Sequence, residues 1–128
     1  MKGKMVFSNV EAREKILERK DTFLLPVDLK GKTIVGDLDI YGETIERFVD
    51  LANTTVKGDL NFGNTTFKRG LSLSGAIVEG ILNAGGMIFK KVIDLSTKEG
   101  PKKIWVDQKN AQMMHWAAPN IPLVIRKE

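Results

Sequence analysis

The sequence has no cysteine, one histidine and no long apolar run. Without cysteine there is no disulfide framework, no thiolate metal site and no cysteine nucleophile, a composition that fits the reducing cytoplasm. The first ten residues lack the apolar core of a secretory signal, and no segment reaches the roughly 18 apolar residues that a membrane span needs. We therefore expect a cytoplasmic protein without a membrane partner.

Aromatic residues are also few, at 7%, and the charge is not strongly of one sign. The net charge is +4, and residues 22–99 carry nine basic and ten acidic side chains, so the small excess lies toward the two ends of the chain. Binding to a nucleic-acid backbone depends on clustered lysine and arginine. This distribution argues against a nucleic-acid partner.

What the chain has in abundance is an eleven-residue repeat, which covers residues 22–99 in seven consecutive units. With Phe23 as position one, positions one, five and seven are apolar in every unit. Spacings of four, two and five residues cannot stay on one face of a helix, whereas the alternation over positions five to seven is typical of a short strand with one buried face. Position nine is mostly glycine or asparagine, which tolerate left-handed backbone angles, so each unit should turn a corner there.

Position three shows that the structural period is twice as long. From the second unit onward a glycine and a cation alternate at this position, which is occupied by Gly36, Arg47, Gly58, Arg69, Gly80 and Lys91. Each unit is then half of a 22-residue coil, with glycines stacked on one side and cations on the other. The sequence predicts an all-β solenoid of about 3.5 coils spaced about 4.8 Å apart, in which each strand pairs with the equivalent strands above and below.

The N-terminal segment, residues 1–21, does not follow the repeat, and we expect it to cover one end of a single domain. Residues 8–20 predict a helix, because Ser8 and Glu11 have the spacing of a capping box. The expected apolar stripe of this helix consists of Val10, Ile16 and Leu17.

The C-terminal segment, residues 100–128, predicts a mixed α/β cap, with a helix over 107–118 that Asp107 could N-cap and a strand over 121–125. The ends of a solenoid expose unpaired strand edges that must be covered. This segment could cover its own coil or pair with a second copy of the chain, so both a monomer and a homodimer remain open. The candidate interface residues are Met113, Met114, Trp116, Ile121, Leu123 and Ile125.

The half-coil units resemble the pentapeptide-repeat family, whose motif is a small residue, Asp or Asn, Leu or Phe, and two variable residues. Residues 60–64 and 65–69 follow this pattern, with Gly70 as a sixth residue before the next motif. The resemblance implies a right-handed, four-sided β-helix with the central Leu or Phe and the small residue pointing inward. Two departures are visible. Val or Leu stands in one half where the family prefers Ala, and position eleven changes from threonine to Ile77 and Ile88, so the later coils should be more apolar on an outer face.

No unique polar constellation interrupts the repeat, and we therefore expect no catalytic residue, no metal site and no cofactor. Asp, Asn or Ser fills position six of every unit, and a catalytic site would appear once, so this recurrence favours hydrogen bonds to neighbouring backbone. His115 is the only histidine; no acidic or cysteine cluster lies beside it, and the chain carries no nucleophile signature.

These observations predict a non-enzymatic structural or protein-interaction module that presents a flat face or dimerises through its C-terminal segment. Two alternatives remain. Arg47, Arg69 and Lys91 would form a ladder with rungs about 4.8 Å apart, which could bind an anion or nucleic acid or could simply be a solvated edge. The family resemblance also raises a DNA mimic that binds topoisomerase, but such mimics are long and strongly acidic, unlike this chain.

Overall fold

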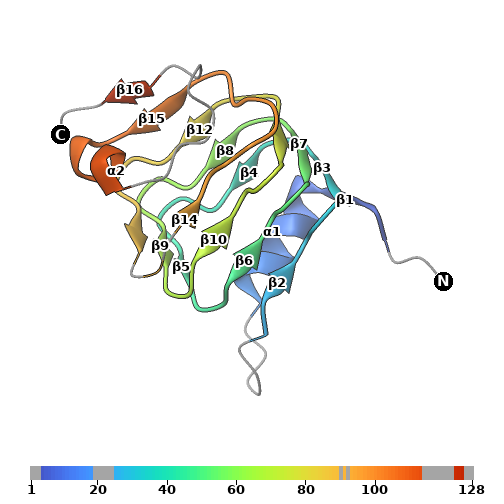
Figure 1. The fold of residues 1–128 in the computed structure, drawn as a ribbon. Helices are drawn as coiled ribbons and strands as arrows, with labels where there is room; N and C mark the ends of the chain where they lie inside the picture. The colour runs from blue at the N-terminus through green and yellow to red at the C-terminus, as the bar shows by residue number, and fades with distance from the viewer. Residues whose placement is uncertain (1–3, 19–24, 90, 92, 114–122, 126–128) are drawn as a thin grey trace.

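The computed structural model describes residues 4–18, 25–89, 91, 93–113 and 123–125. They form a four-sided β-solenoid of stacked coils, closed at its N-terminal end by helix α1 (Asn9–Leu17) and carrying helix α2 (Gln108–Met113) near its C-terminal end (Figure 1). All paired strands are parallel. Each strand is only two or three residues long, as the alternation pattern predicts.

Each side of the solenoid is one sheet. Sheet A contains β1 (Val6–Ser8), β3 (Thr33–Val35), β7 (Thr55–Lys57) and β11 (Ile77–Val78). Sheet B contains β2 (Val27–Asp28), β6 (Val49–Asp50), β10 (Leu71–Ser72) and β14 (Ile93–Asp94). Sheet C contains β4 (Leu38–Asp39), β8 (Leu60–Asn61), β12 (Leu82–Asn83), β15 (Ile104–Val106) and β16 (Leu123–Ile125). Sheet D contains β5 (Thr44–Ile45), β9 (Thr66–Phe67) and β13 (Ile88–Phe89).

The register confirms the 22-residue coil. Leu38 pairs with Leu60 and Leu60 pairs with Leu82, each 22 residues further along the chain. The chain visits sheets B, A, C and D in turn and then returns to B one coil higher, so B faces C and A faces D. Successive eleven-residue units therefore lie on opposite sides of the same coil.

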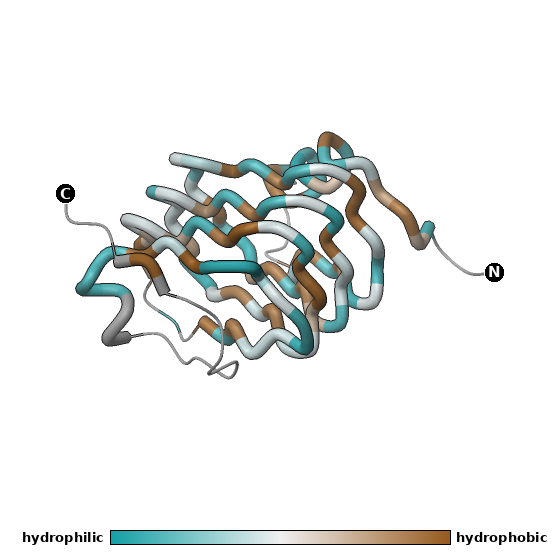
Figure 2. Tube along the Cα trace, turned by 90° about the horizontal axis from the view of Figure 1, so that it is seen from above, coloured by the Kyte–Doolittle hydropathy of each residue, from teal (hydrophilic) through white to brown (hydrophobic). Residues whose placement is uncertain are grey.

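The predicted inward columns form the core. Of the twenty described residues at positions one, five and seven, nineteen are at most 3% exposed, and Phe89 is partly buried against them. Figure 2 shows hydrophobic and hydrophilic segments alternating along the coils. Phe62 and Phe67 meet edge to face inside the stack, with ring centroids 5.4 Å apart. Burial of each such side chain contributes about 1.5–3 kcal/mol, so the regular column is the main source of stability.

The corners also follow the predicted pattern. Position nine has positive φ in six units, at Gly31, Gly42, Asn53, Asn64, Gly75 and Gly86. At position three, the glycines lie at the corner between sheets A and C, whereas the cations lie at the opposite corner, between D and B. The glycine corner is crowded: a Cβ on Gly58 would lie 2.6 Å from the carbonyl oxygen of Gly36 in the coil below. Only glycine lets the backbones approach this closely.

The N-terminal cap is shorter than predicted and contains an additional strand. The capping box of Ser8 and Glu11 is present, but α1 ends at Leu17 instead of residue 20. Its buried residues are Ala12 and Ile16, and Val10 is 58% exposed, so the prediction that Val10 faces the core is wrong. Ala12 is buried instead, because the face of α1 that contacts β3 and β4 carries Ala12 and Ile16. The unpredicted strand is β1, which pairs with β3.

An ion pair and a backbone hydrogen bond, both to Glu11, stabilise the first turn of α1. The Lys4 ammonium donates a hydrogen bond to the Glu11 carboxylate, which also accepts the backbone N–H of Ser8. Both interactions favour the ionised carboxylate and lower the pKa of Glu11 from 4.5 to about 2. A carboxylate in the first turn is also favoured by the helix dipole.

The C-terminal segment first adds a strand to sheet C and then forms helix α2, which is not part of the repeat. The unpredicted strand β15 extends sheet C with Ile104 opposite Leu82, and β16 then pairs with β15. The expected helix over 107–118 is α2, Gln108–Met113, within the described residues, and the strand expected over 121–125 is β16, Leu123–Ile125. Two side chains replace backbone groups of a missing next coil: Asp107 Oδ1 accepts the N–H of Gly86, and Asn110 Nδ2 donates to the Met87 carbonyl.

Position eleven lies on two different faces, so the apolar change expected in the later coils falls on the outer sides of both sheet A and sheet D. Ile77 lies in sheet A beside Thr55, whereas Ile88 lies in sheet D beside Thr66. Ile88 is 56% exposed and Ile77 is half-buried. The two residues are half a coil apart, so they occupy opposite sides of the solenoid.

Candidate functional site

The residues at position six of the repeat, four of which are aspartates, have the structural role that their recurrence predicts. In all seven units the side-chain oxygen of this residue accepts the backbone N–H two residues later, at 2.9–3.2 Å. This hydrogen bond tightens the turn that follows each strand. The residues are Asp28, Asp39, Asp50, Asn61, Ser72, Asn83 and Asp94.

The coil geometry places alternate members of this set on one surface, the outer face of sheet C. Asp39, Asn61 and Asn83 stand in register, and the same row continues through Trp105 to Val124. The Asn83 amide donates to Asn61 Oδ1 at 3.1 Å, so the row is linked between coils. The outer face of sheet C is thus polar in its middle, with aromatic residues near both ends.

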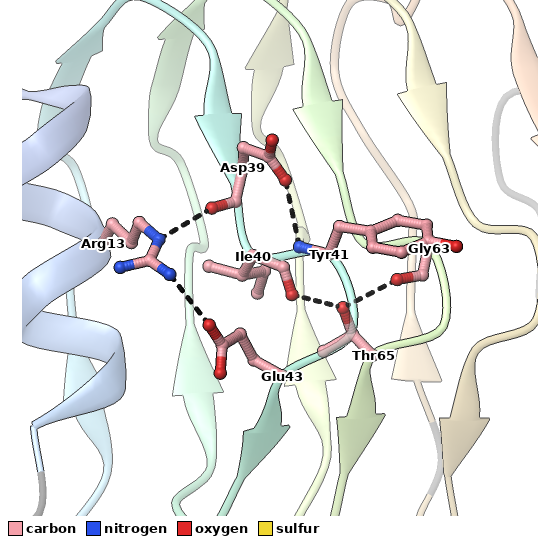
Figure 3. Close-up of polar contacts among 7 residues, drawn as sticks. All are labelled: Arg13, Asp39, Ile40, Tyr41, Glu43, Gly63 and Thr65. Carbon is pink, nitrogen blue, oxygen red and sulfur yellow. Dashed lines mark hydrogen bonds and ion pairs between the residues drawn. The ribbon is translucent and has the colours of Figure 1, made fainter.

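Helix α1 seals the N-terminal edge of sheet C (Figure 3). Asn9 Nδ2 donates to the Asp37 carbonyl at 2.9 Å, and Arg13 Nε donates to the Asp39 carbonyl at 3.1 Å. Arg13 Nη2 also pairs with Glu43 Oε2 at 2.8 Å. These side chains supply the donors that a preceding coil would otherwise provide to β4, so this edge is closed to strand pairing.

Tyr41 lies beside this junction and points along the outer face of sheet C (Figure 3). Its ring rests on Gly63, where a Cβ would lie 2.8 Å from the ring, and its hydroxyl accepts the Asn64 amide at 2.5 Å. Tyr41 nevertheless remains 54% exposed. A tyrosine fixed against a glycine and open to solvent is a preorganised contact surface.

Two hollows lie on the outer face of sheet C. The larger, which we call the α1 groove, has a volume of about 390 Å³ and is lined by Asn9, Val10, Arg13, Asp37, Asp39 and Tyr41. The smaller has a volume of about 110 Å³ and is lined by Asp59, Leu60, Asn61, Ile81, Asn83 and Trp105. A volume of several hundred Å³ is in the range of ligand sites, so the α1 groove is the candidate binding site on this face.

The three residues of the predicted basic ladder lie in one column, but the first of them, Arg47, already bonds to backbone carbonyls. Arg47 donates from Nε to the Leu25 carbonyl at 2.6 Å and from Nη2 to the Pro26 carbonyl at 3.3 Å. These bonds fasten the start of the first coil to the second. Arg69 and Lys91 follow at the same corner of later coils and are exposed.

The predicted C-terminal interface is only partly described. Leu123 and Ile125 lie in β16, the outermost strand of sheet C, and Met113 ends α2. Met114, Trp116 and Ile121, as well as His115, lie outside the described residues. Among the described residues, no group of three or more metal-binding side chains comes together.

No helix within the described ranges is long and apolar enough to cross a membrane. Comparison with protein-family models, with curated proteins and with solved structures found no match. We therefore assign the class of this protein from its geometry alone. It is a short four-sided parallel β-solenoid with a helical N-terminal cap.

Tyr41, Trp105 and the α1 groove were not singled out from the sequence. Trp105 lies 22 residues after Asn83, so extending the coil period beyond residue 99 would have placed it in sheet C. The α1 groove has no comparable signal, because the 27-residue offset between Phe7 and Ile34 breaks the period.

Proposed function

We propose that this protein is a non-enzymatic interaction module built on a β-helix of the pentapeptide-repeat kind, and that it self-associates through the C-terminal edge of sheet C. The proposal rests on one observation, which is that the two edges of sheet C are covered differently. Side chains of α1 bond the carbonyls of Asp37 and Asp39, just before and within β4, whereas the opposite edge ends in the strand β16.

The recurring bonds of the acidic residues support a role without catalysis. At position six every carboxylate holds a turn. At the glycine corner Asp37 Oδ1 accepts the N–H of Asp59, and Asp59 Oδ1 accepts the N–H of Ile81, both at 2.8 Å. Because these hydrogen bonds recur in successive coils, we assign these carboxylates a structural role.

The family resemblance receives support from side-chain direction. In residues 60–69, the central Phe62 and Phe67 are fully buried, as are Leu60 and Thr65 at the small position of each motif. Thr65 Oγ1 donates to the Ile40 carbonyl in the coil below at 2.8 Å, which satisfies its buried hydroxyl. The four sides of the solenoid agree with what the resemblance implies, and the sixth residue after every second motif accounts for the 22-residue coil.

The geometry of β16 suits pairing with a second copy. In sheet C, Leu82 and Ala84 donate to carbonyls of the next coil, and alternate residues of a strand direct their backbone groups to opposite sides. Leu123 and Ile125 stand in the same register positions, so their backbone groups face away from β15. A two-fold axis through Val124 would pair the two β16 strands antiparallel, with Leu123 of one copy opposite Ile125 of the other.

This arrangement makes a specific test possible at Val124, whose side chain is 38% exposed. On the two-fold axis Val124 faces its own copy, so like charges there oppose pairing and opposite charges restore it. We expect the wild type to dimerise, Val124→Lys and Val124→Glu each to be monomeric, and an equimolar mixture of the two variants to form a heterodimer. Light scattering over a range of concentrations measures the mass in solution of the wild type, of each variant and of the mixture.

Val35→Lys is the matched control, because Val35 is 48% exposed but lies in β3, between two paired strands. It should leave the dimer intact. A wild type that remains monomeric at every concentration, or a mixture of the two Val124 variants that does not associate, contradicts the proposed interface.

A further inference from the structure

The α1 groove lies at the opposite end of the solenoid from β16. Its lining comes from α1 and from the first coil of sheet C, so it depends on the N-terminal cap being docked. It combines an exposed aromatic ring, an exposed aliphatic side chain and two exposed aspartates, namely Tyr41, Val10, Asp37 and Asp39.

The charge balance within the groove is negative, although the chain as a whole carries +4. The Arg13 guanidinium is already paired with Glu43 and bonded to the Asp39 carbonyl. Asp37 and Asp39 each use one carboxylate oxygen to accept a backbone N–H, at 2.8 and 3.0 Å. Each leaves its second carboxylate oxygen for an incoming donor, and the next coil adds the exposed carboxylate of Asp59 beside Asp37.

The apolar part of the lining determines what kind of cation fits. Tyr41 is 54% exposed and Val10 is 58% exposed, so the groove offers an aromatic ring and an aliphatic surface beside the carboxylates. The ring of a tyrosine attracts a cation, and the aliphatic stem of lysine or arginine packs on apolar surface while its charged end stays polar. A hydrated metal ion has no aliphatic stem to pack on Val10 and Tyr41.

We infer that the α1 groove binds a lysine or arginine side chain presented by an extended segment of a partner protein. The cationic end lies between Asp37 and Asp39, and the stem lies along Tyr41 and Val10. The partner segment then follows the flat outer face of sheet C toward the Asn61–Asn83 row. This goes beyond self-association and does not depend on it, because the two surfaces lie at opposite ends of the stack.

The experiment titrates the full-length chain with short peptides and follows the backbone amide resonances of Asn9, Asp39 and Tyr41. The probes are acetyl-Gly-Ser-Lys-Ser-Gly-amide, the same peptide with arginine, and the same peptide with uncharged norleucine. We expect the lysine and arginine peptides to saturate these resonances and the norleucine peptide to bind at least fivefold more weakly, since it lacks the charge-assisted hydrogen bond.

The substitution Asp39→Asn should weaken lysine-peptide binding by roughly fivefold or more, because it removes the charge and keeps the shape. It preserves the turn, because asparagine makes the same turn at Asn61 and Asn83. The matched control is Asp28→Asn, at the same position of the coil but on sheet B, with the same 3.0 Å bond to the residue two places on. Tyr41→Leu keeps apolar volume without the π-face and should also weaken binding.

Equal binding of the norleucine peptide, equal losses in Asp28→Asn and Asp39→Asn, or no saturable shift at these resonances would each overturn the inference. Calcium chloride alone serves as the competing probe. If calcium saturates the same resonances and displaces the lysine peptide, the groove is a metal site and the inference is wrong. A chain that stays monomeric but binds the peptide refutes only the self-association, so the two proposals fail independently.

Discussion

Replacing Gly80 with alanine should disrupt the glycine corner between sheets A and C. The Gly80 N–H donates to the Gly58 carbonyl at 3.0 Å, and an added Cβ would lie 2.6 Å from that same oxygen. The Cβ would also collide with Asp59 Oδ1, which accepts the N–H of Ile81 at 2.8 Å. The backbone of Gly80 does not have positive φ, so the predicted effect comes from crowding between coils and not from torsional strain.

The magnitude follows from these contacts. Overpacking of a close contact costs about 1–3 kcal/mol, and displacement of the Asp59 carboxylate weakens a hydrogen bond that contributes about 1.5–3 kcal/mol. Alanine restricts the unfolded chain and returns about 0.4–1 kcal/mol. The net loss in free energy of unfolding is about 3 kcal/mol, which at a typical urea dependence of about 1.5 kcal/mol per M lowers the midpoint by about 2 M.

Urea unfolding followed by far-ultraviolet circular dichroism measures this loss, with Gly42→Asn as the matched control. A Cβ on Gly42 would meet nothing within 4 Å, and Asn64 has the same left-handed backbone at the equivalent position of the next coil. The control should change stability by less than about 0.5 kcal/mol. If Gly80→Ala costs no more than Gly42→Asn, close approach of the coils is not what requires glycine at this corner.

Three further predictions concern the core and the cap. Thr65→Val removes a buried hydroxyl that bonds to the coil below and should cost about 0.5–1.5 kcal/mol in unfolding free energy, whereas Thr66→Val on the half-buried outer side should change it by less than about 0.5 kcal/mol; equal effects would contradict the interior bond. Phe67→Ala deletes one ring of the edge-to-face pair and should cost about 3–5 kcal/mol, and a loss below 1 kcal/mol would show that this position is not core. The pKa of Glu11 is lowered from 4.5 to about 2 on folding, so its contribution to stability is complete above about pH 4.5 and is lost as the pH falls through about 2. The difference in unfolding free energy between wild type and Glu11→Gln should shrink over that range, and a difference that is constant with pH would refute the ionic contribution.

The fold was predictable from the sequence because the repeat is local and strict. The inward columns, the left-handed corner at Gly42 and its equivalents, and the turn-forming oxygen of Asp39 each recur every eleven residues, and all were confirmed. The capping box at Ser8 and Glu11 was equally predictable, because it depends on a spacing of three residues.

The errors lie where a contact is not periodic. Val10 was expected in the core, but Ala12 is buried there instead, because the packing of α1 on the first coil decides which face of the helix is covered. The strand β15 was missed although Ile104 continues the 22-residue register from Leu82. Asp107 was expected to cap a helix, and its carboxylate instead accepts the Gly86 N–H in place of a backbone carbonyl.

The α1 groove could not be predicted from the sequence. Position six looks uniform along the sequence, yet the half-coil separation sends Asp28 and Asp39 to opposite faces. Only one of those faces also receives Tyr41 and the side chains of α1. The α1 groove combines residues from the repeat with residues from the irregular cap.

By itself the sequence determined the solenoid, its 22-residue coil and the buried columns, because side-chain alternation and turn chemistry act over a few residues and repeat without interruption. The tertiary structure alone decided how the two ends differ: Asn9 and Arg13 close one edge of sheet C, while β16 ends the other. The physical reason is that stacking satisfies the backbone of every coil except the first and the last. The groups left over at the ends must find partners that no repeat specifies.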